Sequence, residues 1–297
     1  MPDNNEVRSS HEVSVSSTDP GAVDSRPQIP ARRGLEAARC VRRAGLRRLC
    51  EQAQGSAQTK IALIDGLVET NHPSLRHARF DIVEAGVRAR HHSAAAAGHA
   101  TFIASVLAGE GADFVGLCPR CPIVNIPAID EEMLAGHLAA RECARRLVEA
   151  INLAVTAGAR IIQLSLALGF GDEREGRWIA EALTAAARTG VKIIMAASPR
   201  GLTRHNPLLW LDSVIPVIGA DPQGKVVYDR RWGVAMAIRG LSAPGTDIPG
   251  AMLPAGSRLG SGSSFAACFV TATLALLRAA VPGAPLHAAA LALFGDI

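Results

Sequence analysis

The sequence predicts an α/β domain in which helices cover both faces of a parallel β-sheet, and three observations favour this fold class. Short apolar runs, such as residues 61–64 and 160–166, alternate with longer helical stretches, as in a parallel sheet. Hydrophobic residues make up 48% of the 297 residues but aromatic residues only 4%, so we expect an aliphatic core. Aliphatic strands buried on both faces suit a parallel sheet packed against Ala-rich helices.

The expected strands and helices follow one another from residue 61 onward. We expect strands at residues 61–64, 123–126, 160–166, 191–196, 214–219 and 234–238. Helices are expected to start near His99, to span about 132–157 and 173–189, and to run from Ser264 to about residue 280. No internal repeat interrupts this order, so the alternation describes one large domain.

Composition divides the chain into three regions. Residues 1–30 are rich in Ser, Pro, Asp and Asn, and we expect a disordered N-terminal tail. Residues 31–56 are interpreted as a basic helical arm, because seven arginines from Arg32 to Arg48 stand against a single acid, Glu36. Residues 57–297 form the expected α/β domain.

The basic arm has two interpretations. A run of like charge is usually the solvated face of a helix, here one that caps the domain. The alternative is an arm that binds an acidic partner or the leader of a peptide substrate. Seven arginines and one acid give the segment from Arg32 to Cys50 a net charge of +6, whereas the whole chain carries +4. The remainder therefore sums to −2, close to neutral, and we expect no nucleic-acid partner.

Cysteine content and hydropathy narrow the class of protein further. Six cysteines are too few for a disulfide scaffold, and only Cys118 and Cys121 form a close pair, with no second pair to complete a zinc site. A loop turn with two thiols is the favoured interpretation of that pair. The polar N-terminus has no apolar signal core, and no run is long enough for a membrane span, so we expect a cytoplasmic protein with no membrane partner.

Three short segments carry residue types that together suit nucleophilic catalysis. Asp65 ends an apolar strand, His99 opens an apolar helix, and Ser264 lies where a Gly/Ser-rich run enters a helix. Alone, each is more often a turn residue, a packed histidine or a helix cap. Together they supply a serine, a histidine to take its proton and an acid to orient that histidine, in one of the chain orders known for this triad.

These segments resemble the signature blocks of the subtilisin (subtilase) family of serine peptidases. The run DGLV from Asp65, followed by HPSL, resembles the Asp-Thr-Gly block and its downstream His-Pro-Asp-Leu. GHAT around His99 resembles Gly-His-Gly-Thr, and GSSFA around Ser264 resembles Gly-Thr-Ser-Met-Ala. Weaker similarities lie at residues 116–119, 162–166 and 241–245, so the resemblance spans about residues 60–277.

The resemblance implies a three-layer fold of the subtilisin type and a serine endopeptidase that works through an acyl-enzyme. Ser264 would attack the scissile carbonyl, His99 would act as general base and then acid, and Asp65 would orient His99. The backbone N–H of Ser264 would be one oxyanion donor. An added substrate strand would pair with three consecutive residues: Ser165, Leu166 and Ala167.

One departure from the family pattern concerns the second oxyanion donor. The family uses an Asn side chain at a position that falls on Pro199, which has no side-chain donor. Loss of such a donor lowers turnover on the order of a hundredfold to a thousandfold. Asn206, a few residues on, and Ser198 are the two candidate replacements.

Two functions from different classes therefore follow. The first is a selective intracellular processing protease acting on a peptide or protein substrate, and maturation of a precursor peptide is one form of it. The second is a catalytically impaired subtilisin-like protein that binds peptides, which the proline favours. The intact set of Asp65, His99 and Ser264 favours the enzyme.

Relatives commonly bind calcium, but no dense acidic loop is present here, so neither a metal nor a cofactor is expected.

Overall fold

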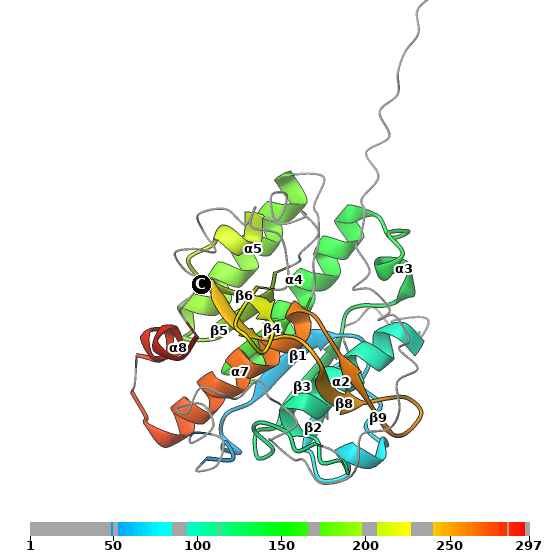
Figure 1. Ribbon diagram of the computed structural model, residues 1–297. Coiled ribbons are helices and arrows are strands. Elements are labelled where there is room, and N and C mark those ends of the chain that lie inside the picture. Colours follow the sequence, from blue (N-terminus) through cyan, green and yellow to red (C-terminus); the bar gives the residue numbers. More distant parts are fainter. Residues whose placement is uncertain are drawn as a thin grey trace, which may run out of the picture.

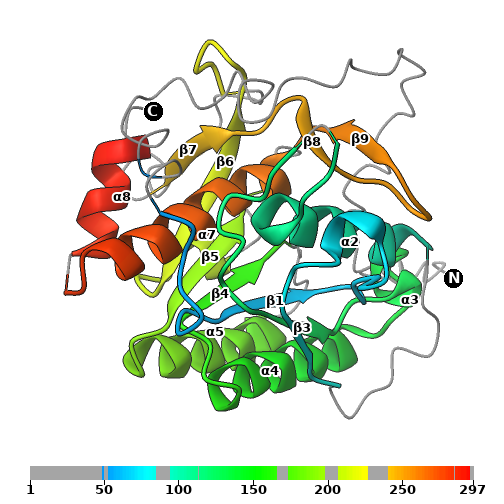
Figure 2. The ribbon, with the colours of Figure 1, turned by 90° about the horizontal axis from the view of Figure 1, so that it is seen from below.

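A parallel β-sheet covered by helices forms the centre of the molecule. The structure is a computed structural model that describes residues 49, 53–84, 94–112, 114–165, 173–197, 207–226, 240–283 and 285–294. Within these residues, seven strands form one sheet with the order β2-β3-β1-β4-β5-β6-β7, and all its neighbouring strands are parallel. Helices lie against both faces of the sheet (Figures 1 and 2), which confirms the predicted fold class.

The elements have the following bounds. The strands of the sheet are β1 (Ile61–Asp65), β2 (Phe80–Ile82), β3 (Ile123–Pro127), β4 (Ile161–Leu164), β5 (Lys192–Ala196), β6 (Val214–Ala220) and β7 (Leu241–Pro244), and β8 (Ile248–Ala251) pairs with β9 (Ser257–Gly260) in a separate hairpin. The helices are α2 (Ala94–Ala108), α3 (Glu131–Leu134), α4 (Ala140–Thr156), α5 (Glu173–Arg188), α7 (Ser263–Ala280) and α8 (Leu286–Phe294), with short 3₁₀ turns η1 (Pro73–Leu75) and η3 (Pro207–Trp210). The strand expected at residues 234–238 lies outside the described residues.

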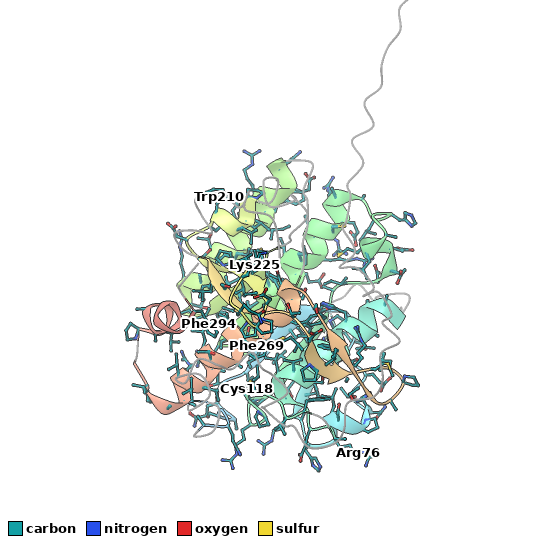
Figure 3. The ribbon with its side chains drawn as sticks, viewed as in Figure 1. Arg76, Cys118, Trp210, Lys225, Phe269 and Phe294 are labelled. Atoms are coloured by element: carbon teal, nitrogen blue, oxygen red, sulfur yellow. The ribbon has the colours of Figure 1, made fainter. Side chains whose placement is uncertain are left out.

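Two apolar cores lie on opposite faces of the sheet and give the fold its three layers. Ile61 and Leu63 of β1 belong to the core beneath α2, α7 and α8, whereas Ala62 and Ile64 belong to the core beneath α4 and α5. This period of two is the alternation of side chains along a strand. Figure 3 labels Phe269 of α7, a fully buried member of the first core.

The prediction of one long helix at about residues 132–157 is wrong in one respect, because the structure has two helices there, α3 and α4. Gly136 adopts a φ of 73°, a left-handed conformation that glycine accepts readily and that ends the first helix. The two helices remain joined by a buried ion pair, in which Nη1 of Arg146 lies 2.6 Å from a carboxylate oxygen of Asp130. Asp130 also caps α3 by accepting a hydrogen bond from the amide of Met133.

Helix α7 runs through the middle of the molecule (Figure 2). Its 18 residues are long and apolar enough to cross a membrane by length and composition, so the expectation that no such run exists is wrong. Most of this helix is nevertheless buried among the strands and helices of the fold. The packing of a central core helix therefore accounts for its apolar sequence.

The basic arm lies outside the described residues except for its end. Leu49 is helical, and its carbonyl accepts a hydrogen bond of 2.9 Å from the amide of Ala53. Both side chains are partly buried and pack against the core beneath α7. The end of the arm therefore meets the domain at this point.

The order of the strands reverses at β1, which lies between β3 and β4. Residues of β1 pair in register with both neighbours, for example Ile64 with Ile126 of β3 and with Leu164 of β4. Such a reversal in an open parallel sheet leaves a crevice beyond the carboxyl ends of the strands, where ligands bind. Asp65, the last residue of β1, lies at this position.

Candidate active site

Asp65 is held in a defined orientation at the end of β1. The residue is only 2% exposed, and its Oδ1 accepts a hydrogen bond of 2.8 Å from the amide of Gly66. Its backbone carbonyl accepts hydrogen bonds from the amides of Ala128 and Ile129, which follow β3. A buried carboxylate fixed in this way can orient a neighbouring cation or N–H group.

Asn125 of β3 supports the turn after Asp65 from below. Its fully buried side chain donates to the carbonyl of Gly66 at 3.0 Å and accepts a hydrogen bond of 3.0 Å from the amide of Val68. These bonds satisfy the backbone of a turn that differs from the family's Asp-Thr-Gly. The sequence analysis missed Asn125, although a lone polar residue inside the apolar run 123–127 was a signal.

His99 contacts Asp65 directly. Its Nδ1 lies 3.0 Å from Oδ1 of Asp65, and 16% of the His99 side chain is exposed. Its Nε2 is buried and has no hydrogen-bond partner among the described residues. The ring is therefore oriented through Nδ1 while Nε2 is left for chemistry.

The position of His99 in its helix differs from the prediction. Helix α2 begins at Ala94, five residues before His99, so the histidine lies within the helix and not at its start. The first turn of α2 is four alanines, which contain no capping residue to mark the start of a helix in the sequence. Thr101 fixes this part of α2 by donating to the carbonyl of Ala97 at 2.6 Å and accepting from the amide of Glu69 at 2.9 Å.

Close backbone packing between Gly66 and α2 brings His99 to Asp65. A Cβ atom at Gly66 would lie 2.4 Å from the carbonyl oxygen of Ala96, which is backbone and cannot move aside. We expect Gly66→Ala to lower the free energy of unfolding by about 3 kcal/mol, as overpacking of a tight site does. The same change at Gly98 meets no atom within 4 Å, so Gly98→Ala is expected to leave stability unchanged or to raise it by about 0.5–1 kcal/mol.

Denaturant unfolding of the two variants beside the wild type measures this difference. The substitution adds the same methyl group at both glycines, and each glycine is next to a residue of the candidate triad, so Gly98→Ala is a matched control. Equal stability of Gly66→Ala and Gly98→Ala would contradict the close approach of α2 to the turn.

Ser264 lies in the first turn of α7, and Gly262 precedes that helix as its N-cap without a side-chain hydrogen bond. The amide of Gly262 donates to the carbonyl of Gly245 at 2.8 Å, and the amide of Gly219 donates to the hydroxyl of Ser263 at 3.2 Å. A Cβ at Gly245 would lie 2.5 Å from Cα of Gly219, so glycine is needed for this contact. Ser263 thus anchors the helix, whereas Ser264 is the serine left for chemistry.

The hydroxyl of Ser264 donates to the carbonyl of Ser165 at 3.3 Å, and both residues are buried. Ser165 follows β4, so the structure brings this predicted substrate-binding residue to the candidate nucleophile. The other predicted residues of the site, Leu166, Ala167, Ser198 and Asn206, lie outside the described residues, as does Pro199.

One helical turn after Ser264, Cys268 lies fully buried in α7. The amide nitrogen of Gln163 donates to its sulfur at 3.4 Å, and the buried Gln163 also donates to the hydroxyl of Ser165 at 3.3 Å. Burial raises the pKa of the Cys268 thiol to about 12, with a smaller contribution from the charge of Asp65. The thiol is therefore protonated at neutral pH and does not compete with Ser264 as a nucleophile.

His72, from the run HPSL, has a structural position. His72 is the N-cap of η1, and its Nδ1 accepts a hydrogen bond of 3.2 Å from the amide of Ser74. Its Nε2 donates to the carbonyl of Met252 at 3.1 Å. Both ring nitrogens are occupied, so this histidine ties η1 to the β8–β9 hairpin. Within the described part of the chain, no three His, Cys, Asp or Glu side chains are placed to hold a metal ion.

Comparison with known proteins agrees with this arrangement. Residues 56–292 match the model of the subtilase family, peptidase S8. The chain matches no curated protein sequence. Similar solved structures include the prenylagaramide maturation protease PagA, at 30% identity and a TM-score of 0.65, with 80% of this chain and 81% of that chain covered.

Two further solved structures have the same fold. The self-cleaved protease domain of PatA is 28% identical with a TM-score of 0.61, covering 75% of this chain and 81% of that one. The PatG macrocyclase in complex with peptide is 22% identical with a TM-score of 0.63, covering 79% of this chain and 80% of that one. The sheet, the helices on both of its faces and the match over most of its length show that the chain belongs to the subtilase family of serine endopeptidases.

Proposed function

We propose that this subtilase cleaves peptide bonds with Asp65, His99 and Ser264 as its catalytic triad, and that it is a selective processing protease. The observation that carries the proposal is the 3.0 Å contact between Nδ1 of His99 and Oδ1 of Asp65, which leaves the buried Nε2 of His99 without a described partner. The ring of His99 also packs against Phe265, the residue after Ser264, at 5.9 Å between centroids. These contacts support a site in which the histidine faces the nucleophile.

Each step of the reaction has a candidate group. Oγ of Ser264 forms a bond to the scissile carbonyl carbon while its proton passes to Nε2 of His99. The oxyanion accepts a hydrogen bond from the uncapped backbone N–H of Ser264 in the first turn of α7. Collapse breaks the C–N bond, and His99 returns the proton to the leaving amine. Water then attacks the acyl-enzyme by the same route in reverse.

The contact between Ser264 and Ser165 suggests how substrate prepares the nucleophile. In the structure the hydroxyl of Ser264 donates to the carbonyl of Ser165 and not to His99. A substrate strand lying along residues 165–167 presents a backbone N–H to that carbonyl. This N–H competes for the carbonyl, so the hydroxyl of Ser264 is released to turn toward Nε2 of His99. Hydrogen bonds in unliganded active sites commonly tighten in this way.

The substrate we propose is a precursor peptide that the protein matures. PagA is described as a maturation protease, and it is 30% identical to this chain over most of its length. The arginines from Arg32 to Arg48 provide a surface for an acidic partner or the leader of such a peptide, although that arm lies outside the described residues. The cytoplasmic location expected from the sequence stays a prediction.

Labelling with a fluorophosphonate probe tests the proposal, because this reagent reacts with an activated serine and needs no knowledge of the substrate. We expect the wild-type chain to be labelled and Ser264→Ala to be unlabelled. Ser263→Ala is the matched control: it removes a neighbouring hydroxyl that bonds to Gly219, and we expect it to keep its label. A folded wild type that takes no label would favour the peptide-binding alternative.

A further inference from the structure

An arginine with no acidic partner among the described residues lies close to the candidate active site. The guanidinium of Arg258, in β9, lies 4.9 Å from the ring centroid of Phe102. Phe102 packs at 4.5 Å against Phe265, which in turn packs at 5.9 Å against His99. The three contacts form a continuous stack, here called the Arg258 stack, from the hairpin to the candidate base.

The hairpin is shaped to receive this stack. Gly250 of β8 is paired with Arg258, and a Cβ atom there would lie 2.7 Å from the ring of Phe102. A Cβ at Gly260 would lie 2.9 Å from both Phe102 and Phe265. Two positions on the same face of the hairpin thus lack side chains, which lets the two tilted rings approach the backbone closely and places the guanidinium of Arg258 over Phe102.

The guanidinium of Arg258 has N–H groups that can donate hydrogen bonds to a ligand. The side chain is partly buried, and burial lowers its pKa from the ordinary arginine value, but arginine stays charged in proteins. Stacking on a ring uses the flat face of the guanidinium and leaves the N–H groups at its edge. Among the described residues, no acid forms an ion pair with it. A partly desolvated charge of this kind is stabilised by a carboxylate ligand.

The stack ends at His99, the residue that would protonate the leaving group. His99 must give a proton to the leaving amine, so the substrate segment after the scissile bond starts at Nε2 of His99. Ser165, which the acyl segment would pair with, instead follows β4 in the sheet. An extended chain advances about 3.3–3.6 Å per residue, so the three contacts of the stack span no more than about four residues.

We propose that Arg258 is a specificity-determining residue that binds an acidic side chain of the substrate within about four residues after the scissile bond. The inference rests on the proposed function, because it needs a substrate that passes His99. The guanidinium offers two parallel N–H groups to the carboxylate, a geometry that lysine lacks. Phe102 holds that fork in one orientation before the substrate arrives.

Cleavage of a mixed peptide library by the full chain, with the products identified by mass spectrometry, tests this inference. We expect Asp and Glu to be enriched among the first four residues after the cleaved bond. Arg258→Gln is expected to reduce the preference for acids over their amides by about tenfold to a hundredfold. Arg258→Glu should change the preference from acidic residues to Lys and Arg. Arg258→Lys should keep only part of the preference for acidic residues.

Controls separate this inference from the proposed function. Arg160→Gln removes an exposed arginine before β4, at the opposite end of the strands, and should leave the profile unchanged. Residues before the cleaved bond should be selected equally by all the variants. Cleavage whose profile after the bond is the same in wild type and Arg258→Gln would overturn the inference and leave the protease intact. Absence of any cleavage by the wild type would overturn the proposed function, and the inference with it.

Discussion

Replacing either Ser264 or His99 by alanine is expected to lower kcat/KM for a cleaved peptide roughly a millionfold, and the double variant is expected to lose no more than either single one. The two groups act as a unit, because the hydroxyl of Ser264 is a poor nucleophile until a base takes its proton. Once either group is removed, the remaining one no longer contributes to catalysis. The residual rate then comes from substrate binding and the N–H groups at the start of α7.

Steady-state kinetics of the wild type, both single variants and the double variant measure this non-additivity. Circular dichroism and thermal unfolding should show that all four share one fold, since among the described residues each of the two side chains makes one hydrogen bond, to Ser165 and to Asp65. Losses that multiply in the double variant would mean that His99 and Ser264 act independently, which the triad does not allow.

Removal of Asp65 is the second large effect. Asp65→Ala is expected to lower kcat/KM on the order of ten thousandfold, because His99 then loses both its orienting acceptor and the charge that stabilises the imidazolium. Asp65→Asn should lose less. The amide of Gly66 donates to Oδ1, so an asparagine would turn its carbonyl oxygen to that position and could still accept from Nδ1 of His99.

The comparison of the two variants, on one peptide substrate and at one pH, separates orientation from charge. A crystal structure of Asp65→Asn would show whether the amide oxygen faces both Gly66 and His99. If Asp65→Asn and Asp65→Ala lose activity equally, the hydrogen bond from Gly66 does not control the orientation of this side chain.

Much of the fold and the contact at the site's centre could be predicted from the sequence. The apolar runs that became β1, β3 and β5 are short and rich in branched residues, so their type and place were clear. Asp65 and His99 stand in blocks with distinctive neighbours, and the structure brings them within 3.0 Å. Helix ends were harder: the glycine that divides α3 from α4 lies in an otherwise helical pattern, and only its φ of 73° shows the break.

The residues that support the site were not predicted, because they belong to other segments and act through tertiary contacts. Asn125 meets the turn after Asp65 only once β3 pairs with β1. The Arg258 stack joins a hairpin, α2 and α7, and no local pattern links an arginine in one to a phenylalanine in another. The hydrogen bond from Gln163 of β4 to Cys268 of α7 likewise joins segments that lie far apart in the sequence.

The distribution of the candidate triad along the chain also bears on how the protein is made. Asp65 belongs to the first strand of the sheet, while Ser264 lies on the last long helix, which packs against β4, β5, β6 and β7. Parallel sheets with such distant contacts fold slowly, because loop closure precedes the contacts that reward it. A chain still emerging from the ribosome lacks the candidate nucleophile until α7 begins to be synthesised. Ser264 follows every described strand of the sheet in the sequence, so the candidate triad is complete only after all of these strands have been synthesised.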